Sequence, residues 1–350
     1  MRFACFPLVP DINVLIRHHK LMESDRICQV ISFNEDKEKL RKLEATTNIP
    51  CTTSVEKGLE QADALLLFDN MPKLRWDKYY NCIDYARFLG IPIFASRKLI
   101  SQIEDQTRRA QLKQIENVHA LKLTYFDERL YEIKTPIITV MGLGENCGKV
   151  ECQLEFKEQL DAGGYHSEWI CSNPLGACEG MHALPDFMFD ENLAFPGKVY
   201  ALNRYVYDLC ASYKPDVLVL GVPGGIVSLA DKTTNYFSEI PLVVSSALHV
   251  DFSILTFYYR TAVYDDYLDR LTRYCLHRYQ TRVPIFYMAR QMMAYNEEYS
   301  KTEQLFLSDT YIAKHPSNLR LKENVATPLK NNAPVFQSLI TRLQENFETV

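Results

Sequence analysis

The sequence contains no long apolar segment and no basic tract. No apolar run approaches the roughly 18 residues that cross a membrane, and the N-terminal residues form no apolar region of the secretory kind. The formal net charge is −5, so a polyanion such as nucleic acid is not expected as a partner. We therefore predict a cytoplasmic protein that binds neither a membrane nor nucleic acid.

Clustered cysteines are also missing. The ten cysteines are scattered along the chain, and no two of them form a C-x-x-C pair. Zinc and iron–sulfur sites need clustered thiolates, and a disulfide framework is not expected in a chain of 350 residues without an export signal. Cys171 and Cys178 are the nearest approach to a pair outside the glycine-rich segment, and a metal site there is the minor alternative to two buried thiols.

A dinucleotide fingerprint is absent from the N-terminal region, although that region has the pattern of a parallel α/β sheet. No G-x-G-x-x-G follows the first predicted strand, so the dinucleotide-binding form of the fold is not supported. Asp69 and Asn70 follow the third strand, where such sheets bind ligands, but a turn is the simpler explanation. The predicted strands are 2–9, 26–33, 64–68 and 91–95, and the predicted helices are 11–22, 55–61, 76–89 and a charged one at 102–116.

The most informative segment runs from Pro136 to Val150. An apolar, β-branched run at 137–141 leads into a glycine-rich turn that ends in Gly148-Lys149, and a helix is predicted at 150–161. A strand, a glycine loop, Gly-Lys and a helix together cradle a nucleoside triphosphate, because backbone N–H groups and the helix N-terminus face the phosphates. The predicted nucleotide-binding residues are Gly142, Leu143, Gly144, Glu145, Asn146, Cys147, Gly148, Lys149 and Val150.

This segment departs from the common form G-x-x-x-x-G-K-[ST]. Five residues separate Gly142 from Gly148, and Val150 stands where a magnesium-binding hydroxyl belongs. A second buried strand, predicted at 216–220, leads through Gly221 to Gly224 and Gly225, which we add to the nucleotide site. Such a strand beside the phosphate loop usually delivers an acid to magnesium-bound water. Gly221 has no side chain to do this. Whether the site binds Mg²⁺ and whether it hydrolyses the nucleotide are therefore left open.

Other residues are candidates for the metal and for catalysis. Glu151 begins the predicted helix and is a candidate magnesium ligand, although a favourable charge at a helix N-terminus explains it as well. Asp186, in the long loop after the strand at 167–171, is a second candidate, with a turn or helix cap as the alternative, and Glu179 lies in the same loop. His182, four residues before Asp186, is a candidate general base oriented by that aspartate; a structural histidine is the alternative. Lys149 completes the predicted catalytic set.

Three features follow in the C-terminal half. A helix is predicted at 198–213, and an apolar strand at 242–244 precedes His249, where loops of related folds contact the base. Residues 252–279 interleave tyrosine with arginine, which is typical either of a peptide-binding surface or of an amphipathic helix that covers the sheet. A terminal helix is predicted at 334–347. We predict domains at 1–130 and 131–297 and a C-terminal extension at 298–350.

The glycine loop resembles that of dethiobiotin synthetase and its relatives in the SIMIBI class of P-loop proteins, whose loop also carries one extra residue. In those proteins the second strand ends in Glu-Gly-Ala-Gly-Gly, and Gly224 and Gly225 match the last two glycines. The loop at 141–149, the segment at 182–189 and the segment at 221–226 also resemble the peptide maturation system proteins. Genes for that family lie beside a radical-SAM maturase and a cysteine-rich precursor peptide.

These resemblances imply a Rossmann-like or flavodoxin-like N-terminal sheet followed by a SIMIBI-type P-loop domain that binds ATP or GTP. They also imply a role in maturing a ribosomally synthesised peptide, with the precursor peptide and the maturase as partners. Two functions remain open: an enzyme or switch that uses nucleotide turnover, and a non-catalytic scaffold with a degenerate P-loop. The oligomeric state, a homodimer included, is left open.

Overall fold

The computed structural model describes residues 1–18, 26–69, 74–116, 128–227, 238–264, 266–296 and 301–348. The chain divides into two compact units. Unit 1 comprises Met1–Asn117 with Ala177–Gly180, and unit 2 comprises Val118–Gly176 with Met181–Val350. The boundary predicted near residue 130 thus falls earlier, at residue 117, and the predicted extension at 298–350 is part of unit 2.

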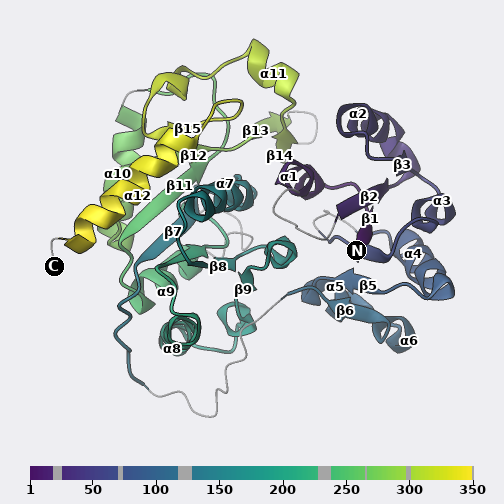
Figure 1. Ribbon diagram of the computed structural model, residues 1–350, viewed down its shortest axis with the longest axis horizontal. Coiled ribbons are helices and arrows are strands. Elements are labelled where there is room, and N and C mark those ends of the chain that lie inside the picture. Colours follow the sequence, from purple (N-terminus) through teal and green to yellow (C-terminus); the bar gives the residue numbers. More distant parts are fainter. Residues whose placement is uncertain are drawn as a thin grey trace. The chain divides into compact units, whose positions relative to one another are not determined.

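Unit 1 is built on a six-stranded, all-parallel sheet (Figure 1). In spatial order the strands are β3 (Cys51–Thr52), β2 (Arg26–Ile31), β1 (Arg2–Phe6), β4 (Ala64–Leu67), β5 (Ile93–Ala95) and β6 (Leu112–Gln114). From β1 the chain adds β2 and β3 on one side and then β4, β5 and β6 on the other, which is the strand order of Rossmann-like sheets. The predicted parallel α/β class is therefore confirmed. The helices are α1 (Pro10–His18), α2 (Lys37–Thr47), α3 (Val55–Leu59), α4 (Trp76–Leu89), α5 (Arg97–Gln102) and α6 (Gln106–Arg109).

In unit 1 the structure contradicts one predicted helix and shows what Asp69 contacts. The charged helix predicted at 102–116 is wrong, because Asp105 caps the new helix α6 by accepting from the N–H of Arg108 at 3.0 Å, and β6 follows. Asp69 lies after β4, as expected, and its Oδ2 accepts from the Ser96 hydroxyl at 2.8 Å. This bond ties the ends of β4 and β5 together. Asn70 lies outside the described residues.

Unit 2 has a seven-stranded parallel sheet with β7 at its centre. Helix α7 (Lys149–Ala162) lies on one face with α12 (Ala333–Glu348) (Figure 1). Phe156 of α7 stacks on Phe336 of α12 at 5.5 Å between ring centroids. The other face is covered by α8 (Phe195–Tyr213), α9 (Glu239–Ala247) and α10 (Asp266–Tyr279). The strands, in spatial order, are β15 (Val325–Ala326), β12 (Ile285–Met288), β11 (Phe252–Phe257), β7 (Ile137–Gly142), β10 (Val217–Gly221), β8 (Ser167–Cys171) and β9 (His182–Ala183).

This sheet confirms the two strands on which the site prediction depends. β10 pairs with β7 in parallel, with Leu220 opposite Thr139, and every residue of both strands is buried. Because parallel strands covered on both faces read as continuous apolar runs, both were recognisable in the sequence. Their carboxyl ends lie at the same edge of the sheet, so the glycine-rich segments that follow them meet there.

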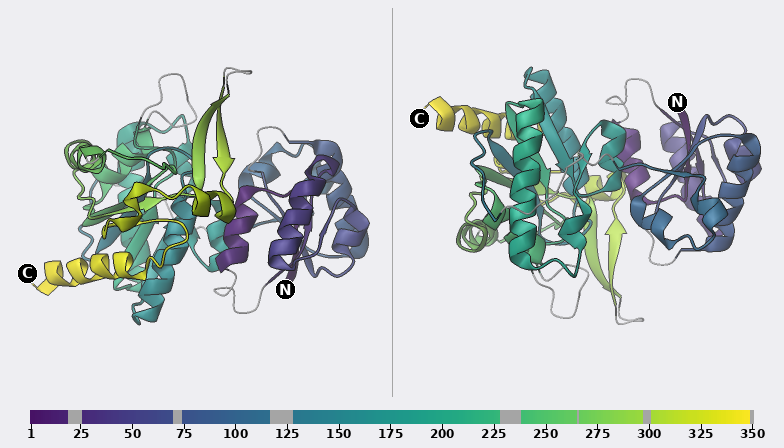
Figure 2. Two further views of the ribbon diagram at one scale, coloured as in Figure 1. Left: turned by 90° about the horizontal axis from the view of Figure 1, so that it is seen from above. Right: turned by 90° about the horizontal axis from the view of Figure 1, so that it is seen from below.

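The remaining elements complete unit 2. Strands β13 (Gln291–Asn296) and β14 (Lys301–Phe306) pair antiparallel and form a ribbon that projects from the body of this unit (Figure 2). The short helices of this unit are α11 (Asp309–Lys314), η4 (Asp186–Phe189) and η6 (Asn318–Leu321). Helix η3 (Pro174–Glu179) is divided between the two units at residue 177, and unit 1 contains η2 (Asn34–Asp36). Of the helices in the described part of the chain, none has the length and apolar content that a membrane crossing requires.

The strand predicted at 242–244 is wrong, because these residues belong to α9. A short apolar run does not distinguish a buried strand from a buried helix, and Pro241 is tolerated because it lies in the first turn of the helix. The true strand is β11, and His249 precedes it. His249 therefore lies at the amino-terminal edge of the sheet, opposite the edge where the glycine loop lies.

The aromatic region at 252–279 likewise divides into two elements, β11 and α10. The amphipathic helix is therefore confirmed for 266–279 only. Two of its tyrosines have an internal role: the hydroxyls of Tyr274 and Tyr279 both donate to the carbonyl of Ile226, at 3.0 and 2.6 Å. They hold the segment that follows β10.

Candidate phosphate-binding site

The glycine loop, residues 142–148, leaves the carboxyl end of β7 and is held by its two neighbouring strands. Leu143 N–H donates to the carbonyl of Thr256 in β11 at 2.8 Å, and the N–H of Ile226, after β10, donates to the carbonyl of Gly142 at 2.8 Å. A Cβ at Gly142 would lie 2.5 Å from Cys147 Sγ and 2.8 Å from the Gly144 carbonyl oxygen. The turn is therefore too tight for a side chain at this position.

Gly148 forms the junction between this loop and helix α7. Its φ is 80°, in the left-handed region, and α7 begins at the next residue. Side chains rarely adopt that region, and a Cβ at Gly148 would also lie 2.8 Å from the Cβ of Ala289. The left-handed backbone conformation and the close packing against Ala289 therefore both require glycine at this position.

Lys149 is a buried cation whose partners are neutral. Its Nζ donates to the carbonyls of Gly144 at 3.1 Å and Gly224 at 2.7 Å, and the residue is only 8% exposed. Among the described residues no carboxylate pairs with it. Burying a charge is costly unless it is paired, so this position is suited to an anionic ligand.

Other buried cations of unit 2 do have carboxylate partners. Lys198 Nζ lies 2.9 Å from Glu239 Oε1, and Arg290 Nε lies 3.4 Å from Glu151 Oε1. The same unit thus neutralises its structural cations internally, which sets Lys149 apart from them.

The N-terminus of α7 adds hydrogen-bond donors beside Lys149. No side chain caps this helix. Within the described part of the chain, the N–H groups of Gly148, Lys149 and Val150 have no hydrogen-bond acceptor. Unsatisfied N–H groups and the helix dipole favour a negative charge at this end. The predicted loop residues, Lys149 and the turn at Gly224 therefore meet in one place, with Gly225 buried in the same turn.

Side chains from the loop and from β11 fix the conformation of the loop. Tyr258, directly after β11, donates its hydroxyl to the carbonyl of Glu145 at 2.5 Å. Cys147 Sγ donates to the Gly144 carbonyl at 3.0 Å and lies 3.1 Å from Thr256 Oγ1. Asn146 has a positive φ of 49°, a conformation that asparagine tolerates. Thr256 had no sequence signal, because its strand was not recognised. Tyr258 falls in the tyrosine- and arginine-rich region at 252–279, but that pattern did not indicate a contact with the loop.

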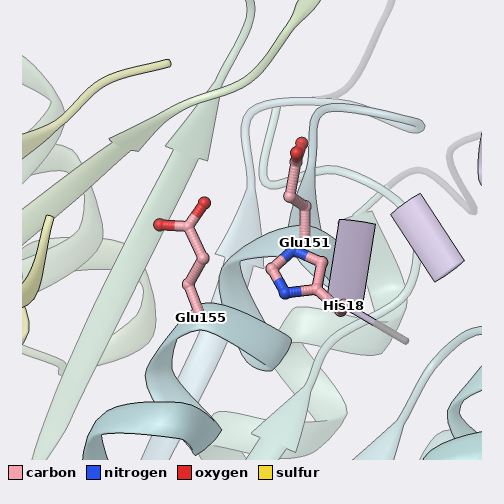
Figure 3. A group of neighbouring side chains, drawn as sticks. All are labelled: His18, Glu151 and Glu155. Carbon is pink, nitrogen blue, oxygen red and sulfur yellow. The ribbon is translucent and has the colours of Figure 1, made fainter. Parts of the chain in front are cut away.

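The two positions that usually supply magnesium ligands in P-loop proteins carry no ligand in this chain. Val150 offers no hydroxyl, and Gly221 offers no carboxylate. The predicted ligand Glu151 is ion-paired with Arg290, whose Nε lies 3.4 Å from Glu151 Oε1, and a carboxylate oxygen of Glu151 lies within 4.8 Å of one of Glu155. The role of Glu151 as a metal ligand stays a prediction. Glu155, one turn further along α7 (Figure 3), accepts from the Tyr287 hydroxyl at 2.7 Å and from Asn332 Nδ2 at 2.8 Å.

Gln153 occupies the space where an acid at position 221 would lie. It is fully buried on α7, and its Nε2 donates to the carbonyl of Ile170 at 3.1 Å. A Cβ added to Gly221 would collide with Gln153 Oε1 and would lie 2.9 Å from its Cδ. Within the described residues Oε1 has no hydrogen-bond partner. The only sequence signal for Gln153 is its spacing of four residues from Lys149, which puts both on one helix face.

His182 does not lie with Lys149. Its Nε2 is 3.0 Å from Glu168 Oε2, and its ring packs on Tyr213 at 5.1 Å between centroids. Glu168 is near the start of β8 and Tyr213 ends α8, so both contacts point toward the amino-terminal edge of the sheet. Asp186 is exposed at the start of η4. Glu168 therefore contacts the His182 ring, and the predicted pairing of His182 with Asp186 stays a prediction.

The Cys152 thiol does not supply a nucleophile. Burial raises the pKa of the Cys152 thiol on α7 well above its ordinary value, which keeps it protonated. Burial also raises the pKa of Tyr287, and the carboxylates Glu151 and Glu155 add to this effect. Lys149 and the backbone N–H groups at the start of α7 are therefore the groups that this site offers to an anion.

Comparisons with known proteins bear on the fold. No family model matches the chain, and no curated protein matches it. A solved structure of a DUF1611 family protein from Anabaena variabilis is similar over 97% of this chain and 99% of that chain, with a TM-score of 0.60 and 14% sequence identity. At this identity the likeness shows a shared fold alone.

A second structure covers less of the chain. The WlbA dehydrogenase from Bordetella pertussis, in complex with NADH and UDP-GlcNAcA, matches 43% of this chain and 49% of that chain at 16% identity. Its TM-score is 0.27, so this likeness carries no argument.

Proposed function

We propose that unit 2 binds the phosphate groups of a nucleotide, ATP or GTP or their diphosphates, at the glycine loop. The observation that carries this proposal is the buried Lys149 ammonium, which contacts only carbonyl oxygens among the described residues. A phosphate at this position accepts from Lys149 and from the N–H groups that begin α7. It thus supplies the negative charge that the buried cation needs.

The proposal extends to the role of the bound nucleotide. Because Val150 and Gly221 provide no metal ligand, we favour a nucleotide sensor or scaffold over an enzyme that hydrolyses the nucleotide. A role beside a radical-SAM maturase and a precursor peptide rests on the sequence resemblance alone. Phosphate release stimulated by such a partner would favour the enzyme instead.

The test is nucleotide binding to wild type and to Lys149→Met, measured by isothermal titration calorimetry. Met keeps the length of the side chain and removes the charge. Loss of a charged hydrogen bond costs about 1.5–3 kcal/mol, so affinity should fall by about 10- to 150-fold. In wild type, ligand at about 100 times its dissociation constant should add about 2.7 kcal/mol to the free energy of unfolding.

Lys157→Met is the matched control. Lys157 lies on the same helix and pairs with Asp161 at 2.7 Å, so this variant should bind like wild type. Equal binding by all three proteins would refute the role of Lys149. A folded wild type that binds none of these nucleotides would refute the proposed function.

A further inference from the structure

Gln153 lies on α7, four residues after Lys149, and its side chain packs against Gly221 at the end of β10. Its Nε2–H donates to Ile170 in β8, while its Oε1 is directed at Gly221 in β10. The bond to Ile170 fixes which end of the amide faces Gly221, because a reversed amide would bring two oxygens together. Oε1 is thus a buried acceptor without a donor among the described residues.

We propose that this site takes its phosphate ligand without a divalent cation, and that Gln153 is the residue that adapts it to do so. This inference rests on the proposed function and specifies its ligand. A carboxylate beside phosphate oxygens repels them unless a metal lies between the two. The neutral amide of Gln153 does not repel them, and its Oε1 accepts a hydrogen bond from an ordered water or a protonated phosphate oxygen.

The charges at the site agree with a ligand of low charge. Lys149 supplies one positive charge, and the N-terminus of α7 supplies the equivalent of about +0.5. Together they approach the charge of a single phosphate monoester, about −1.5 to −2. A triphosphate carries more negative charge and usually shares it with magnesium. With no metal bound, the site therefore suits a phosphate ester of low charge, and a nucleoside mono- or diphosphate suits it better than a triphosphate does.

The experiment measures the affinity of the full chain for ADP and ATP by calorimetry, in excess MgCl₂ and in excess EDTA. For wild type we expect ADP to bind with dissociation constants within about threefold of each other in the two buffers. In EDTA, Gln153→Glu should weaken ADP binding by about tenfold or more, because it places a carboxylate near the phosphate. Magnesium should restore part of that loss.

Two further variants serve as a control for the added charge and as a second test of the Gln153 acceptor. Gln159→Glu makes the same change elsewhere on α7 and should leave binding unchanged. Gln153→Met removes the acceptor without adding a charge and should weaken ADP binding by about 2- to 12-fold, the range expected for one neutral hydrogen bond. It tests the proposal if Gln153→Glu does not fold.

The outcomes separate this inference from the proposed function. Wild type that binds ADP or ATP only with magnesium would overturn the inference and leave the proposed function standing. Wild-type affinity in EDTA for both Gln153 variants would also overturn it. If wild type binds no nucleotide in either buffer, both proposals fail.

Discussion

Replacement of Gly148 by alanine tests whether the loop junction is fixed by packing as well as by its backbone conformation. A non-glycine residue in the left-handed region costs about 1–2 kcal/mol. The added Cβ would also lie 2.8 Å from Ala289 Cβ and 3.2 Å from Ala289 Cα, and overpacking of this kind costs about 1–3 kcal/mol. The sum predicts that Gly148→Ala lowers the free energy of unfolding by about 2–5 kcal/mol.

Gly164→Ala is the matched control. Gly164 has a φ of 76°, close to the 80° of Gly148, but a Cβ there would meet nothing within 4 Å. This variant therefore carries the backbone cost alone, and the entropy that alanine removes from the unfolded chain is the same in both. The difference between the two variants should be the packing cost, about 1–3 kcal/mol. That corresponds to about 2–12 °C in melting temperature for a unit of this size.

Urea unfolding followed by tryptophan fluorescence measures this difference. The chain has two tryptophans, Trp76 in unit 1 and Trp169 in β8 of unit 2. A Trp76→Phe background makes the signal specific for unit 2. Equal unfolding midpoints for the two alanine variants would refute the packing argument and leave only backbone strain at Gly148.

Two other perturbations have defined outcomes. Gly144→Ala would place a Cβ against the Tyr258 hydroxyl, so it should destabilise unit 2 by about 1–3 kcal/mol. Adding Tyr258→Phe to this variant should recover part of the lost stability. If the costs of the two substitutions are additive in a double-mutant cycle, the contact is contradicted. In unit 1, hydrogen bonds from Arg2 lower the pKa of Asp63 to about 2. Because the folded pKa lies below the ordinary value of 3.8, this pair stabilises unit 1 above about pH 4 and stops doing so as the pH falls toward 2. Asp63→Asn should flatten the dependence of the Trp76 unfolding midpoint on pH over that range, and parallel profiles for variant and wild type would exclude the assignment.

The sequence by itself determined the elements whose signals are local. The strand at 137–141, the glycine turn and the helix that follows could be recognised because a buried parallel strand reads as a continuous apolar run. The alternation of strands and helices likewise predicted both parallel sheets. Local signals failed where they were ambiguous: the apolar run at 242–244 has the composition of a strand but lies in α9.

Only the tertiary structure decided which groups complete the site. Lys149 reaches the carbonyl of Gly224 from 75 positions away in sequence, and Gln153 fills the space beside Gly221. Glu168, 14 positions before His182 in sequence, contacts the His182 ring. These pairings depend on the order and register of parallel strands, which long connections separate in the chain. A spacing of four residues puts Lys149 and Gln153 on one face of α7. The packing of that face against β10 determines what each of them contacts.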